Sequence, residues 1–126
     1  MSPKCILLVD DSAVVRLAVC RMFEANGYRI CGEASNGKEA IEKAEQLHPD
    51  LIVLDLSMPV MNGLEAAHIL SRTMPSVPLI LYGNYAGILR EKDARSAGIS
   101  AVVSKDKAAS ILVSTAQSLL HRAEAA

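Results

Sequence analysis

Four charged residues in this sequence are of types that together can transfer a phosphoryl group. Asp10 and Asp11 are adjacent, and Asp55 and Lys105 each come at the end of a short apolar run or close to it. Carboxylate oxygens suit Mg²⁺, which takes one or two carboxylates and keeps several waters. A further carboxylate can be the nucleophile, while metal and lysine spread the charge of the transferring group. This chemistry requires a fold that brings the four residues together.

Five short apolar runs alternate with helical patterns along the 126 residues. The runs are nearly continuous, which is typical of strands covered on both faces. Helical spacing lies between and after the runs, clearest over 109–120 and weaker over 64–74 and 88–97. In the first helical stretch, the spacing predicts one buried stripe of Val14, Leu17, Ala18 and Met22. The predicted strands are Cys5–Val9, Ile30–Ala34, Leu51–Leu54, Leu79–Tyr82 and Ala101–Val103.

This alternation predicts one α/β domain over residues 1–126, a doubly wound five-stranded parallel sheet with helices on both faces. In such sheets the working site lies beyond the carboxyl ends of the strands. We therefore expect Asp10, Asp11, Asp55 and Lys105 to converge. Carboxylates so close together raise one another's pKa, so the cluster calls for Lys105 and a divalent cation.

Composition excludes several classes of protein. With 13 Lys and Arg against 14 Asp and Glu, the net charge of −1 lacks the basic excess of a nucleic-acid binder. The apolar runs are far shorter than a membrane span, and the start of the chain does not resemble a leader, so we expect a cytoplasmic protein. Cys5, Cys20 and Cys31 are predicted to be reduced, buried thiols.

Each charged residue also has a simpler interpretation. Asp10, Asp11 and Ser12 are residues that favour the start of a helix, and at that position they would only cap it. Asp55 could begin a turn, and an isolated Lys105 is usually a solvated surface lysine. The placement of all four at strand ends favours the chemical interpretation.

The motifs at these positions resemble those of a bacterial two-component response-regulator receiver domain, with a chemotaxis-regulator-like fold. The resemblance rests on Val9-Asp10-Asp11-Ser12, on the segment 55–63 and on Lys105, and it runs from about residue 4 to residue 120. It implies the strand order 2-1-3-4-5.

The resemblance also implies a role for each site residue. Asp55 would accept a phosphoryl group from a phosphohistidine on a sensor histidine kinase or a phosphotransfer protein. Mg²⁺ would be bound by Asp11 directly, with Asp10 assisting, and by Asp55 and the backbone carbonyl of Ser57. Lys105 would pair with the phosphoryl group.

Such a domain signals rather than catalyses a reaction on a substrate. The resemblance implies that phosphorylation changes a face made by the fourth helix, fifth strand and fifth helix, roughly residues 85–120. The partner would be a downstream protein or an output domain, and the family allows a phosphorylation-dependent homodimer. The chain would be either a stand-alone receiver or the amino-terminal domain of a DNA-binding regulator.

Two positions depart from the family pattern. Gly83 stands where the family usually carries a Thr or Ser that binds the phosphoryl group, and Val102 stands where it usually carries an aromatic residue. Asn84, Tyr82 and Tyr85 are the candidates for a rearranged switch. The departures leave open a phosphate-independent pseudo-receiver that only binds a partner.

Two enzyme-like alternatives fit less well. An aspartyl phosphatase would carry a second Asp at position 57, where this chain has Ser. A flavodoxin-like nucleotide carrier would need a phosphate cradle in place of the Asp-Asp-Ser loop.

Overall fold

Five parallel strands form a single sheet in the order β2–β1–β3–β4–β5, which confirms the predicted class and strand order. The computed structural model describes residues 3–84 and 91–125. The strands are β1 (Cys5–Val9), β2 (Arg29–Ala34), β3 (Leu51–Leu54), β4 (Leu79–Gly83) and β5 (Ala101–Ser104). The helices are α1 (Ala13–Ala25), α2 (Gly37–Leu47), α3 (Gly63–Thr73), α4 (Glu91–Ser96) and α5 (Ala109–Ala125).

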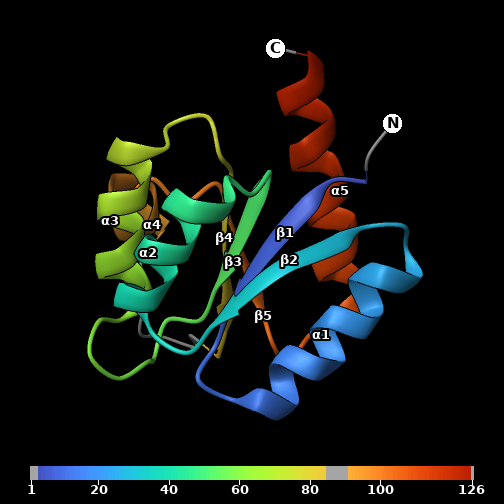
Figure 1. The fold of residues 1–126 in the computed structure, drawn as a ribbon, viewed down its shortest axis with the longest axis horizontal. Coiled ribbons are helices and arrows are strands. Elements are labelled where there is room, and N and C mark those ends of the chain that lie inside the picture. The colour runs from blue at the N-terminus through green and yellow to red at the C-terminus, as the bar shows by residue number, and fades with distance from the viewer. Residues whose placement is uncertain (1–2, 85–90, 126) are drawn as a thin grey trace.

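The helices form a layer on each face of the sheet (Figure 1). α1 and α5 cover one face, while α2, α3 and α4 cover the other. Alternate residues of the central strands supply the two apolar cores, so that Leu7 and Ile52 belong to one and Ile6 and Val53 to the other. The central strands therefore read as continuous apolar runs, because both of their faces are covered.

The two outer strands are only partly covered, and here the expectation of strands buried on both faces is wrong. β2 carries the exposed residues Arg29 and Glu33, and in β5 the side chain of Val102 is 44% exposed. Both strands lie at the borders of the helical layers, where polar residues also protect the edge of a sheet.

The predicted apolar stripe of α1 is wrong for Val14, Leu17 and Ala18, which are exposed, whereas Met22 packs against the core as predicted. Val14 and Leu17 are 79% and 52% exposed, whereas Val19 and Phe23 are buried, with Val15 packed beside them. Both sets of residues have helical spacing, so periodicity alone could not choose between them. The docking of α1 on the sheet decides which set is covered.

Polar caps fix where the first three helices begin. The side-chain oxygens of Ser12, Asn36 and Asn62 accept hydrogen bonds from the backbone N–H three residues further on. In α3 the cap is reciprocal, because the Glu65 carboxylate accepts from the N–H of Asn62. Within residues 3–84 and 91–125, no helix has the length and apolarity needed to cross a bilayer.

The cysteines differ from the prediction of three reduced thiols. Cys5 and Cys31 form a disulfide with a Cα–Cα distance of 5.5 Å, and Cys20 is free and partly exposed. The pairing between β1 and β2 shifts register between Ile6 and Leu7, which places Cys31 in the irregular stretch beside Cys5. The sequence gives no local sign of this shift.

Candidate functional site

Three carboxylates converge beyond the carboxyl ends of β1 and β3. Asp10, Asp11 and Asp55 each place an oxygen within 4.8 Å of the others. β1 and β3 are neighbours, with Val9 beside Leu54, and the Asp55 N–H donates to the Val9 carbonyl at 2.8 Å. The parallel register therefore carries the end of one strand to the end of the other, as the strand-end argument predicts.

The surroundings of Asp55 disfavour its negative charge. The residue is 9% exposed, and this burial raises its pKa. The nearby charge of Asp10 raises the pKa further, as does that of Asp11, while Lys105 acts in the opposite direction. The result is a carboxylate whose pKa lies above its ordinary value, in a pocket that favours an added cation.

Lys105 supplies a positive charge to this pocket. Its Nζ donates to Asp10 Oδ2 at 2.7 Å and lies 3.7 Å from Asp55 Oδ1. Burial alone would lower the pKa of Lys105, but the hydrogen bond to Asp10 and the charges of Asp55 and Asp10 raise it overall. The same Nζ lies 5.7 Å from the centre of the Tyr82 ring, within the range of a cation–π contact.

Asp10 is held by contacts on every polar group. Its N–H donates to the Ala34 carbonyl, and its Oδ1 accepts from the Ser12 N–H at 2.9 Å. The cap of α1 is Ser12, whose Oγ accepts from the Val15 N–H. Ser12 therefore caps α1, as the simpler interpretation predicts. Asp10 is not the capping residue.

The donor set fits a hard divalent ion. Asp10, Asp11 and Asp55 offer carboxylate oxygens, which suit Mg²⁺ better than a softer metal. Asp11 is exposed and, with Leu56 and Ser57, lines an open cavity of about 620 Å³, so an ion has access from solvent.

The loop after β3 closes tightly on Asp55. The Gly63 N–H donates to the Leu56 carbonyl at 2.9 Å, and a Cβ on Gly63 would stand 2.1 Å from the Asp55 carbonyl oxygen. A glycine is therefore required here by close approach. At the tip of the loop, Val60 is 79% exposed and has a φ of +68°, which is strained for a β-branched residue.

The two switch positions lie on neighbouring strands. Gly83 ends β4 beside Ser104 of β5, and its carbonyl accepts from the Lys105 N–H at 3.0 Å. Val102 has an exposed side chain, as does Asn84. Tyr85 and the start of the predicted 88–97 helix lie outside the described residues.

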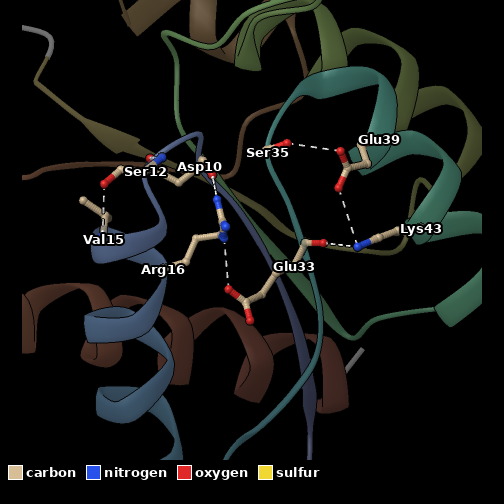
Figure 2. A network of polar contacts seen from close by, with 8 residues as sticks. All are labelled: Asp10, Ser12, Val15, Arg16, Glu33, Ser35, Glu39 and Lys43. Carbon is tan, nitrogen blue, oxygen red and sulfur yellow. Dashed lines mark hydrogen bonds and ion pairs between the residues drawn. The ribbon is translucent and has the colours of Figure 1, made fainter.

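Arg16 and Glu33 join the site without having been predicted. Figure 2 shows the Arg16 guanidinium between Asp10 and Glu33, with a further chain of contacts from Glu33 to Lys43 and Glu39 of α2. Arg16 follows the Ser12 cap by one turn, which is a weak local signal. Glu33 comes from a distant strand, and nothing near it in the sequence marks its partner.

Comparison with known proteins supports the family resemblance given by the sequence motifs. The family model described as "Response regulator receiver domain" matches residues 6–117. The chain is 36% identical over 124 residues to a protein-glutamate methylesterase/protein-glutamine glutaminase of Archaeoglobus fulgidus, covering 96% of this chain and 35% of that protein. It is 48% identical over 77 residues to a protein of the same name from Methanosarcina acetivorans, covering 60% of this chain and 22% of that protein.

A solved structure gives the same result for the fold. The receiver domain protein of Methanospirillum hungatei superposes with a TM-score of 0.88 at 24% identity, covering 98% of each chain. The chain therefore spans a minor part of the methylesterases that it matches. It spans nearly the full length of the Methanospirillum hungatei receiver domain protein. Since the family model spans nearly the whole sequence, the chain belongs to the response regulator receiver domain family.

Proposed function

We propose that this receiver accepts a phosphoryl group on Asp55, in a Mg²⁺-dependent transfer from the phosphohistidine of a sensor kinase or phosphotransfer protein. The observation that carries the proposal is the convergence of three carboxylates with the Lys105 ammonium between two of them. No other arrangement in the described residues combines a nucleophile, a cation and an acidic metal pocket.

The transfer forms one bond and breaks one. An oxygen of the Asp55 carboxylate attacks phosphorus, and the bond from phosphorus to the imidazole nitrogen breaks. The electron pair of that bond stays on the imidazole, which takes up a proton. Lys105, already 3.7 Å from Asp55, moves to the phosphoryl oxygens and offsets their charge.

Mg²⁺ held by Asp10, Asp11, Asp55 and the Ser57 carbonyl would supply further charge neutralisation for the phosphoryl group. Asp10 and its backbone contacts keep the pocket in place, while Asp11 faces solvent, where the ion enters. The chain's own residues thus provide nucleophile, counter-charge and binding pocket.

The test is phosphorylation with acetyl phosphate, a small phosphodonor, followed by intact mass measurement. We expect a gain of one phosphoryl group in the presence of Mg²⁺ and none with a chelator. Asp55→Asn abolishes uptake, and Asp50→Asn keeps it, because Asp50 lies at the opposite end of the sheet and accepts a hydrogen bond from Cys5. Undiminished labelling of Asp55→Asn would identify a different acceptor.

The output of the domain is the second part of the proposal. The signal passes through α4, β5 and α5 to a protein partner, to an output domain of a longer chain, or to a second copy. The chain spans 22% and 35% of two methylesterase relatives and 98% of a solved receiver domain protein, which is compatible both with part of a longer chain and with a separate receiver. In every case the domain signals and performs no chemistry on a separate substrate.

A phosphate-independent pseudo-receiver is the second candidate. It is favoured by the absence of a side chain at Gly83, the position that normally contacts the phosphoryl group. Phosphorylation that leaves the amide spectrum of β5 and α5 unchanged would support it. The cytoplasmic location stays a prediction.

A further inference from the structure

Arg16 links the acidic pocket to the edge of the sheet. Near the start of α1, its Nη1 donates to the Asp10 backbone carbonyl at 2.6 Å, and its Nε donates to Glu33 Oε1 at 3.0 Å. The Arg16 side chain is only 19% exposed, whereas that of Glu33 is 47% exposed. Figure 2 shows the guanidinium spanning the gap between these two acceptors.

The carbonyl that Arg16 contacts belongs to the peptide bond between Asp10 and Asp11. A peptide unit is planar, so fixing the direction of its carbonyl also fixes where the next residue begins. Asp10 is already tied through its N–H and both carboxylate oxygens. The contact with Arg16 also holds the Asp10 carbonyl, and therefore the peptide bond that leads to Asp11.

We propose that Arg16, oriented by Glu33, is a positioning residue that sets the Mg²⁺ affinity of the pocket by holding the peptide between Asp10 and Asp11. The inference rests on the proposed function, since it takes Mg²⁺ as the ion of this pocket. Arg16 touches a backbone atom of the pocket and takes no part in the chemistry itself.

Loss of Arg16 has opposite effects on the Mg²⁺ affinity, depending on whether Arg16 acts through its charge or by holding the peptide in place. As a positive charge near the carboxylates, Arg16 repels a cation, so its removal would tighten Mg²⁺ binding. As a support for the peptide, its removal would loosen the geometry of Asp11 and weaken binding. The sign of the change in affinity therefore separates the two roles.

Glu33 acts on Arg16 through its carboxylate, while its backbone belongs to a separate contact. Lys43 of α2 donates to the Glu33 carbonyl, and Lys43 also forms an ion pair with Glu39 at 3.6 Å. Ser35 donates to the other oxygen of Glu39. Lys43 thus belongs to the same network without contacting Arg16 or the Glu33 carboxylate, which makes it a matched control.

The experiment is a calorimetric titration of the purified chain with Mg²⁺. We expect Arg16→Ala to weaken the affinity about tenfold, the usual effect of losing a group that orients a metal ligand. Arg16→Lys keeps the charge but loses the planar fork, so it also weakens binding. Glu33→Ala weakens binding too, and the Arg16→Ala/Glu33→Ala double variant is no weaker than Arg16→Ala alone. Lys43→Met binds as the wild type does.

Amide hydrogen exchange without metal gives a second readout. In Arg16→Ala we expect faster exchange at the Ser12 N–H, which donates to Asp10, with no change at the Asp55 N–H directly after β3. A general loss of stability would accelerate both. If Arg16→Ala does not fold, Arg16→Lys carries the same expectation.

The outcomes separate this inference from the proposed function. A wild type that binds no Mg²⁺ overturns the proposed metal site and this inference with it. A wild type that binds Mg²⁺, with an Arg16→Ala variant that binds it equally or more tightly, overturns only the role of Arg16. The same holds if Lys43→Met weakens binding as much as Arg16→Ala.

Discussion

The ammonium of Lys105 is bonded to Asp10, at 2.7 Å, rather than to the proposed phosphoryl acceptor, which it approaches only to 3.7 Å. Lys105 therefore occupies one of the carboxylate oxygens that a metal ion would use. We therefore expect binding of Mg²⁺ to be coupled to movement of Lys105 toward a phosphoryl group on Asp55.

Replacing Lys105 is expected to affect metal binding and phosphorylation in opposite directions. Lys105→Met frees the Asp10 carboxylate and should tighten Mg²⁺ binding about fivefold, the equivalent of about 1 kcal/mol for a partly exposed pair. Phosphoryl uptake from acetyl phosphate should fall at least about tenfold, because the counter-charge is lost. Calorimetry and intact mass measure the two, and Lys107→Met is the matched control. A parallel loss of both would contradict the competition.

Asp55→Asn is expected to stabilise the metal-free protein at neutral pH. Because the pKa of Asp55 is raised in the folded state, the protonated form of Asp55 favours folding. This contribution to stability is fully present below the ordinary pKa of aspartate. That contribution is lost as pH rises through the folded pKa, and at neutral pH the buried carboxylate destabilises the fold. Urea unfolding at pH 7 should show the gain in Asp55→Asn.

The same comparison at acid pH provides the check. Below about pH 3, wild-type Asp55 is mostly protonated in both states, so the advantage of Asp55→Asn should disappear. Asp50→Asn, which alters a carboxylate that bonds to the Cys5 N–H, should show no such pattern. A gain in stability that does not depend on pH would point to a cause other than charge.

Restoring the usual switch residues is expected to strengthen the response of the β5 and α5 face to phosphorylation. Among the described glycines, positive φ is confined to Gly27 and Gly98, so a threonine at position 83 meets no strain from a left-handed backbone. In Gly83→Thr/Val102→Tyr, beryllofluoride with Mg²⁺ should shift amide signals across β5 and α5 by more than it does in the wild type. Single variants serve as controls. Matching shifts in the double variant and the wild type would show that these positions do not limit the switch.

The disulfide can be tested by counting thiols. When the chain is unfolded without reductant, iodoacetamide should modify Cys20 alone, and after reduction it should modify all three cysteines. The bond closes a loop with a sequence separation of 26, and its loss should lower the free energy of unfolding by about 3 kcal/mol. Modification of three thiols before reduction would show that the bond is absent in solution.

Replacing Val60 with glycine is expected to stabilise the folded protein. Its φ of +68° costs an L-residue about 1 kcal/mol, and its exposed side chain recovers little by packing. Val60→Gly should therefore raise the free energy of unfolding, less the entropy that glycine gains in the unfolded chain. Thermal unfolding measures the change, and Val14→Gly, in the regular helix α1, should instead be destabilised.

The sequence predicted the convergence of the charged residues better than the surfaces around them. Asp10, Asp55 and Lys105 could be placed because strand ends in a parallel sheet share one edge, whatever the details of packing. The exposure of Val14 and Leu17 could not, because it depends on how α1 docks. The Cys5–Cys31 bond depends on a register shift, and Arg16 meets Glu33 only through the tertiary fold.

The hydrogen bond from the Gly63 N–H to the Leu56 carbonyl closes the base of the loop that follows Asp55. The solvent-facing residues Pro59 and Val60 stand furthest from that closure. Exposed tips of this kind tolerate added sequence. A short epitope or a fluorophore-bearing insert between Pro59 and Val60 would thus report on what approaches the pocket while leaving Asp55 where the strand puts it.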